Sequence, residues 1–282
     1  MNSRSDMSNK WHPLQIIATE SLKPLSLAAG SSIRQIAYEM SNDGCQKNPI
    51  AVARLESGGY VILDGVSRWG AFATLGIKDV LVQVVELGDP QVRLSSWRHL
   101  VSGLTASELK KIVSLLGLSV EKTSSEELKN DLFSHRDRIV IVLSNRDIYQ
   151  VLMDRSDLLK FNRKLSEIVV GYSTNAQLVR LPAEQYTDRM FKNQTRGDAY
   201  IILPTYNQSE VNRILESGDL LPPYLACYSF PRRYIGVKLS LNILAEAVSV
   251  EEKNRFLDEL IRMRLANKRA AFYPQSVFIM ND

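Results

Sequence analysis

A strand pair, a tight Asp-Gly turn and a helix follow one another in residues 50–76. Residues 50–63 predict two short strands joined by a Ser57-Gly58-Gly59 turn, and residues 67–75 predict a helix that ends at a glycine. The connecting turn, residues 64–68, brings free backbone N–H groups, a helix dipole and a guanidinium to one place. The segment therefore predicts an anion site or, as the simpler alternative, a structural Asp-Gly turn on the surface.

The composition is that of an ordinary globular protein. Of the 282 residues, 45% are hydrophobic and 23% are charged, which suits one large domain or two modest ones. The net charge of +4 comes from 35 basic and 31 acidic residues that are spread along the chain. Because no basic stripe interleaved with aromatic residues occurs, the sequence argues against a nucleic-acid partner.

The cysteine usage and the hydropathy indicate a cytoplasmic protein. Cys45 and Cys227 lie far apart in the sequence and outside any Cys/His cluster, so we expect neither a disulfide nor a zinc site. The first ten residues are polar, and no apolar run reaches the length of a membrane span. We therefore expect no membrane partner.

Helical and strand patterns alternate along the chain, so we expect a mixed α/β (α+β) fold. Strands are expected at residues 14–19, 79–85, 138–143, 199–203, 234–239 and 272–280. Helices are expected at residues 31–40, with Ser31 or Ser32 as the cap, and at 105–117, 124–133, 148–170, 209–217 and 250–268.

The Gly88-Asp89-Pro90 break predicts a domain boundary. We expect a disordered tail at residues 1–13, a first domain at 14–90 and an α/β C-terminal domain at 91–282. The resemblance carried by the following motifs implies that the first domain binds nucleotide phosphates and that the second completes the cleft. The motifs of the first domain are Asn48-Pro49-Ile50, Gly58-Gly59, Asp64-Gly65 with Arg68, and Leu75-Gly76 before the strand at 80–85. Together they resemble the ParB/sulfiredoxin-type fold, whose members bind nucleotide phosphates at this turn.

Beyond residue 90 a narrower resemblance emerges. In order, the motifs are residues 64–68, Ser96-Trp97-Arg98-His99, Gly171-Tyr172, 218–223, and Arg233 ahead of 237–241. Their order and spacing resemble the free serine kinase family from about Leu14 to Met280. This family includes archaeal ADP-dependent kinases and the ATP-dependent serine kinase and regulator of the staphyloferrin B siderophore cluster, which the chain resembles most. The resemblance implies phosphorylation of free L-serine to O-phosphoserine in a siderophore or other specialised pathway.

The resemblance also implies roles for the turn. Asp64 would orient the substrate hydroxyl or a metal ion, and no other protein ligand to a metal is expected. The phosphates would be bound by Gly65, Val66, Ser67 and Arg68. The structural alternatives are that Asp64 only caps its turn and that Arg68 forms a surface ion pair.

Three later residues are implied to bind substrate: Trp97, His99 and Arg233. Arg233 would hold a phosphate or the substrate carboxylate. The alternatives are core packing for Trp97, a structural hydrogen-bonded role for His99, and a solvated side chain for Arg233.

The chain departs from the family at three places. In our alignment Ser26 takes the place of the catalytic glutamate of the family, and serine cannot act as a carboxylate base. Glu20 lies upstream of Ser26, and a shifted alignment would make it the catalytic candidate instead. Ser67 replaces the usual histidine before the arginine of the turn. The family's Pro-Pro-Lys-Ser-Thr segment here reads Pro222-Pro223-Tyr224-Leu225-Ala226. These losses indicate an altered substrate, a different base or loss of catalysis.

Three functional hypotheses follow. We favour an ATP- or ADP-dependent, Mg²⁺-assisted kinase acting on serine or a similar small hydroxy amino acid. The alternative is a catalytically impaired pseudo-kinase that senses a ligand and acts as a regulator. A ParB-type DNA-segregation protein is the weakest hypothesis, because no convincing helix-turn-helix follows the first domain. A homodimer is expected from the resemblance alone.

Overall fold

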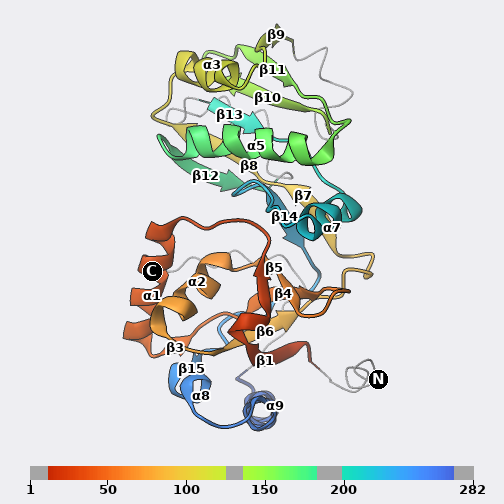
Figure 1. Ribbon diagram of the computed structural model, residues 1–282. Coiled ribbons are helices and arrows are strands. Elements are labelled where there is room, and N and C mark those ends of the chain that lie inside the picture. The colour runs from red at the N-terminus through yellow and green to blue at the C-terminus, as the bar shows by residue number, and fades with distance from the viewer. Residues whose placement is uncertain (1–11, 125–135, 183–198, 270–282) are drawn as a thin grey trace.

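The computed structural model describes residues 12–124, 136–182 and 199–269, which form two stacked lobes (Figure 1). The first lobe contains a five-stranded sheet with the order β1-β6-β4-β5-β2. Its strands are β1 (Leu14–Ala18), β2 (Leu22–Pro24), β4 (Ile50–Arg54), β5 (Tyr60–Asp64) and β6 (Asp79–Val84). A short 3₁₀ helix, η1 (Thr19–Ser21), joins β1 to β2, and the helices of this lobe are α1 (Gly30–Asp43), α2 (Val66–Leu75), α8 (Leu241–Ala245) and α9 (Val250–Ala266).

The second lobe contains a six-stranded sheet with the order β12-β8-β13-β10-β11-β9. Its strands are β8 (Arg98–Ser102), β9 (Glu121–Thr123), β10 (Arg138–Leu143), β11 (Ile148–Leu152), β12 (Gln177–Leu181) and β13 (Ala199–Ile202). Its helices are α3 (Ala106–Leu115), α5 (Leu158–Ser173) and α7 (Gln208–Glu216). The mixed α/β class expected from the sequence is confirmed.

Two small antiparallel ladders complete the described fold. β7 (Arg93–Ser96) pairs with β14 (Ala226–Ser229) where the lobes meet, and β3 (Cys45–Gln46) pairs with β15 (Leu239–Ser240). The second ladder brings the chain back to the first lobe. A division at residue 90 therefore assigns β15, α8 and α9 to the second domain although they pack with the first sheet. The two-domain division itself stays a prediction.

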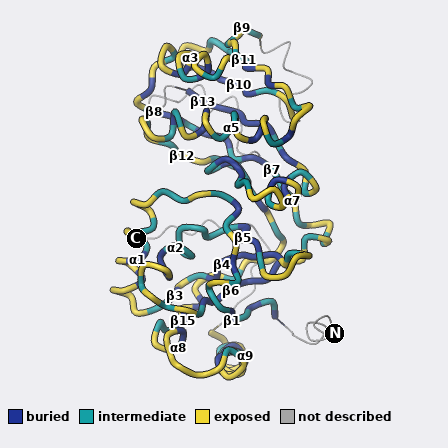
Figure 2. Tube along the Cα trace, viewed as in Figure 1, coloured by how far each residue is buried: buried dark blue, intermediate teal, exposed yellow. Residues whose placement is uncertain are grey.

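The buried side chains form two main clusters: one lies within the first lobe, and the other extends from the second lobe onto Ala53, Val61 and Leu63 of the first sheet. Figure 2 shows buried stretches of chain in both lobes. In the first lobe, Ile62 of β5 and Phe72 of α2 are fully buried and belong to the same cluster. In the second, Leu165 and Tyr172 project from α5 into the core. No described helix has both the length and the apolar character needed to cross a membrane.

Two predicted elements were wrong. Residues 148–170 do not form one helix: β11 pairs antiparallel with β10, and α5 begins only after Asp157, whose carboxylate accepts from two backbone N–H groups. The predicted strand at 234–239 is reduced to its last residue, because Gly236 and Lys238 adopt positive φ angles of 67° and 48°. Both corrections arise from backbone geometry that hydrophobic periodicity does not report.

Smaller corrections concern chain ends and caps. α1 begins after Ala29, and no side chain caps it, so neither predicted serine cap forms. Within the predicted tail, His12 is buried and its Nε2 lies 3.0 Å from Asp258 Oδ1, so the order of the chain begins before residue 14. Residues 1–11, the predicted strand at 272–280 and, apart from Ser124, the predicted helix at 124–133 lie outside the described residues.

Candidate active site

The turn predicted to bind anions lies at the end of β5. Asp64 is the last residue of the strand, and Gly65 is the N-cap of α2 with a φ of 106°. Glycine has no side chain to cap the helix, and no described acceptor takes the amides of residues 66–68. Free first-turn amides and the helix dipole together favour a negatively charged ligand.

Asp64 joins two arginines at this turn. Arg68 Nη2 donates to Asp64 Oδ2 at 3.0 Å, and Arg233 forms an ion pair with the same oxygen. Burial raises the pKa of the Asp64 carboxyl, but the charges of Arg68 and Arg233 outweigh it and hold the pKa below its usual range. Asp64 is therefore an ionised carboxylate that orients two guanidinium groups.

Gln83 of β6 fixes the segment that carries Arg233. The Gln83 side chain donates to the Arg232 carbonyl at 2.6 Å and accepts from the Tyr234 N–H at 3.0 Å. The Arg233 guanidinium also lies 5.3 Å from the centre of the Phe230 ring. These contacts bring a residue 169 positions away in the sequence to the Asp-Gly turn.

Strand register separates the two candidates for the missing glutamate. β2 runs parallel to β5 with Pro24 opposite Ile62, so the chain leaves β2 towards Ser26 at the end of the sheet where β5 reaches Asp64. Glu20 lies in η1, before the other end of β2, where Leu22 pairs with Tyr60. The strand from Tyr60 to Asp64 alone spans about 13 Å. The structure therefore brings Ser26 and not Glu20 to the turn, which does not support the catalytic role predicted for Glu20.

His99 is buried behind the site. Its Nδ1 lies 2.5 Å from the Tyr172 hydroxyl, and its Nε2 lies 2.8 Å from the Tyr224 carbonyl oxygen. Since the carbonyl can only accept, Nε2 carries the proton and Nδ1 accepts from the tyrosine. With no exposed surface, His99 does not reach a substrate, and the structural alternative describes it better than the predicted binding role.

His99 instead positions Tyr224, a residue with an unfavourable backbone conformation. Tyr224 has a φ of 60° and is the first residue after the two prolines that departs from the family pattern. Its neighbour Leu225 accepts a hydrogen bond from the Trp97 N–H at 2.9 Å. An isolated parallel β-bridge between Ser26 and Leu221 connects the same segment to the first lobe. The departing segment therefore lies at the site.

Arg180 is a site residue that the sequence did not identify. Its guanidinium lies 5.3 Å from the Trp97 ring centre and 5.9 Å from that of Tyr224. Its charge also contributes to the lowered pKa of Asp64. A lone arginine in a short strand carries no sequence signal, so only the pairing of β12 with β8 reveals it.

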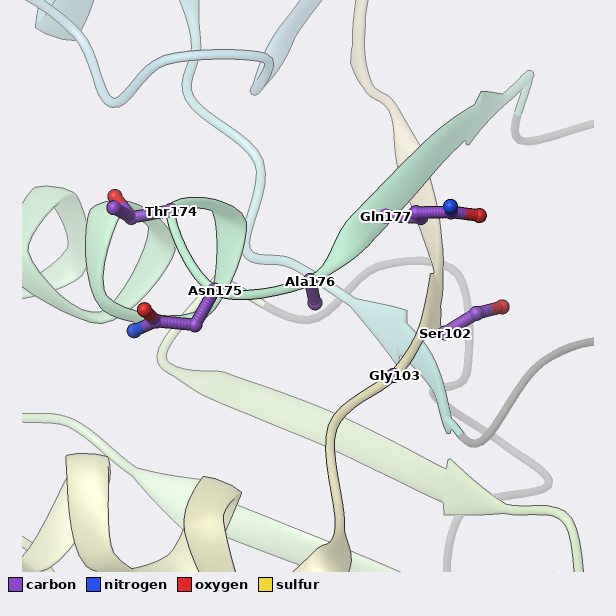
Figure 3. Close-up of a pocket in the computed structure, with 6 residues that line it drawn as sticks. All are labelled: Ser102, Gly103, Thr174, Asn175, Ala176 and Gln177. Carbon is purple, nitrogen blue, oxygen red and sulfur yellow. The ribbon is translucent and has the colours of Figure 1, made fainter.

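A surface hollow of about 510 Å³ lies elsewhere, at the far ends of β8 and β12 (Figure 3). Ser102 and Gln177 pair across the two strands, and their side chains extend to the same side. The hollow has no charged lining residue. Among the described residues, no group of three or more His, Cys, Asp or Glu side chains could hold a metal ion.

Comparison with curated proteins identifies two kinases. The chain is 22% identical over 265 residues to the ATP-dependent L-serine kinase SbnI of Staphylococcus aureus, covering 93% of this chain and 92% of that protein. It is 22% identical over 139 residues to an ATP-dependent L-serine kinase of Staphylothermus marinus, covering 48% of this chain and 54% of that kinase. No protein-family model matches the sequence.

Solved structures show the same fold. C-terminally truncated SbnI from Staphylococcus aureus superimposes with a TM-score of 0.70 at 17% identity, over 92% of this chain and 98% of the other. A free serine kinase in complex with AMP gives 0.65 at 16% identity, over 86% and 97%. The resemblance to the free serine kinase family is confirmed. At these identities, the structures of the family establish the fold of this chain, and activity has to be argued from its own residues.

Proposed function

We propose that this chain is a nucleotide-dependent kinase that phosphorylates the hydroxyl group of a free small amino acid, L-serine or a close analogue. The observation that carries the proposal is the cluster of Asp64, Arg68 and Arg233 at the uncapped N-terminus of α2. The likeness to relatives named L-serine kinases supports the same conclusion. ATP or ADP would be the phosphoryl donor, and the pathway and a homodimer stay predictions.

The turn would bind the donor. The amides of residues 66–68 would receive phosphate oxygens, while Arg68 and Arg233 would offset their charge. Mg²⁺ binds through one or two carboxylates together with substrate phosphates, and the ionised Asp64 fits that requirement. When bound, the ion would neutralise charge on the phosphates.

In the transfer, a bond forms between the acceptor hydroxyl oxygen and the terminal phosphorus of the nucleotide. The bond from that phosphorus to the bridging oxygen breaks, which releases ADP from ATP or AMP from ADP, and the hydroxyl proton passes to solvent water. Asp64 is a weak base because two arginines stabilise its ionised form, so its role would be to orient groups. Phosphoryl transfer depends chiefly on positioning and charge stabilisation, which permits turnover without the glutamate that Ser26 replaces.

The test is ³¹P NMR of the protein with Mg²⁺, ATP or ADP, and L-serine or L-threonine. We expect a new phosphomonoester resonance, and we expect Asp64→Asn to lower its rate of appearance at least 100-fold. Asp147→Asn is the matched control, since Asp147 is also ion-paired, at 2.8 Å from Lys122, but lies in the second lobe. Nucleotide binding without any phosphomonoester would favour the pseudo-kinase alternative over a kinase.

A further inference from the structure

Arg180 has no part in the transfer described above, yet it faces the same site. It lies directly opposite His99 in the antiparallel pair of β12 and β8, so both side chains leave the sheet on one face. Trp97, two residues before His99, projects from that face as well. The second lobe therefore presents Arg180 and Trp97 towards the turn that carries Asp64.

Two aromatic rings hold the Arg180 side chain in place. Trp97 and Tyr224 lie on the guanidinium at 5.3 and 5.9 Å, within the range of cation–π contacts. Among the described residues, no carboxylate forms an ion pair with Arg180. An oriented guanidinium that lacks an acidic partner retains its N–H donors for an anion.

The charges at the site leave room for a second anion. Arg68, Arg180 and Arg233 bring three positive charges, whereas Asp64 brings one negative charge. Arg68 belongs to the helix whose amides face the phosphates, but Arg180 belongs to the opposite lobe. A serine hydroxyl directed at the terminal phosphate places its own carboxylate on the side away from the nucleotide. Arg180 is contributed by the lobe opposite the helix that would bind the phosphates.

We propose that Arg180 binds the α-carboxylate of the amino-acid acceptor, through the paired N–H groups of its guanidinium. The assignment rests on the proposed kinase function and names the group that selects an amino acid over a simple amino alcohol. Trp97 and Tyr224 set the orientation of the guanidinium. Tyr224 would thus take a positioning role at a place where the family has lysine.

The experiment compares L-serine with ethanolamine, which keeps the hydroxyl and amine but lacks the carboxylate. For Arg180→Gln we expect the KM for L-serine to rise at least 10-fold, with the KM for nucleotide unchanged within 2-fold. The preference of the wild type for L-serine over ethanolamine should fall by the same factor. Arg180→Lys, which keeps the charge without the fork, should recover part of the loss.

Arg213→Gln, on the exposed face of α7, is the control and should leave both KM values unchanged. Circular dichroism of each variant verifies folding, and Arg180→Lys keeps the test valid if the glutamine variant does not fold. Turnover with an unchanged KM for L-serine in both Arg180 variants would overturn the assignment alone. No turnover by the wild type would overturn the proposed function and the assignment together.

Discussion

At the level of single residues, His99 is held in its neutral form by its surroundings. Burial lowers the pKa of His99 to about 4, and the charges of Arg180 and Arg98 act in the same direction. The hydrogen bond to the Tyr224 carbonyl opposes this but does not outweigh it. A neutral, doubly hydrogen-bonded imidazole supports the Tyr224 backbone and does not exchange protons at neutral pH.

This predicts a specific pH dependence of stability. Because the folded pKa lies below that of the unfolded chain, about 6.5, the stabilisation is complete above that pH and is lost as the pH falls from 6.5 to 4. Denaturant unfolding at pH 7 and pH 5 should show a drop in unfolding free energy that is about 1–2 kcal/mol smaller in His99→Gln than in the wild type. Equal drops in the two proteins would contradict the neutral histidine.

The positions of Ser26 and Glu20 give a second residue-scale prediction. Ser26→Glu would place a carboxylate at the end of the sheet where β5 reaches Asp64, and a positioned base contributes about 100- to 10,000-fold in rate. We expect this variant to raise kcat for L-serine and Glu20→Gln to leave it unchanged. Steady-state kinetics of both variants makes the comparison. A large loss of kcat in Glu20→Gln would show that Glu20 supplies the catalytic carboxylate, against the inference from strand register.

At the level of elements, the N-terminus of α2 depends on one backbone conformation. Gly65 has a φ of 106°, and a Cβ added there would lie 2.7 Å from the Arg68 guanidinium. Any side chain would therefore strain the turn and displace the arginine that pairs with Asp64. The local geometry of the helix start and the charge arrangement of the site are thus coupled.

Gly65→Ala should weaken nucleotide binding at least 10-fold and destabilise the fold by about 1–3 kcal/mol. Gly44→Ala is the matched control, because Gly44 also has a positive φ, 62°, but open space around it. We expect the control to lose stability without losing affinity. Calorimetric titration with ADP and thermal unfolding separate the two effects; equal affinities in both variants would refute the coupling.

At the level of the whole molecule, the first lobe is completed by the last described elements. Asn254 of α9 exchanges hydrogen bonds of 3.0 and 2.7 Å with the backbone of Ile16 in β1. The buried Lys253 donates to Asp79 at 2.6 Å and to the Leu244 carbonyl at 2.8 Å. The two ends of the described chain therefore fold as parts of one core.

Breaking this buried pair tests that dependence. Asp79→Ala leaves the Lys253 ammonium without its counter-charge in a site where it is 2% exposed, and should cost about 3–5 kcal/mol. The double variant Asp79→Leu/Lys253→Met removes both charges and should recover most of that loss. Urea unfolding of both proteins measures the difference. An undiminished stability in Asp79→Ala would mean that α9 contributes little to the first lobe.

The sequence by itself determined the local features of this protein. The Asp-Gly turn with its flanking strands and helix follows from residues 50–76, because glycines and short-range periodicity fix backbone geometry over a few residues. The order of motifs was sufficient to reveal the resemblance to the free serine kinase family. Asp64 and Arg68 lie four positions apart at the start of a helix, and they form an ion pair.

Only the tertiary structure decided which distant residues share the site. Arg233 reaches Asp64 through Gln83, and Arg180 faces it because β12 pairs with β8. The register of β2 on β5 likewise indicates that Ser26, and not Glu20, lies towards the Asp-Gly turn. Pairing between strands depends on the packing of whole sheets, so a one-residue shift in register changes every neighbour. That information is non-local and cannot be read from a single stretch of sequence.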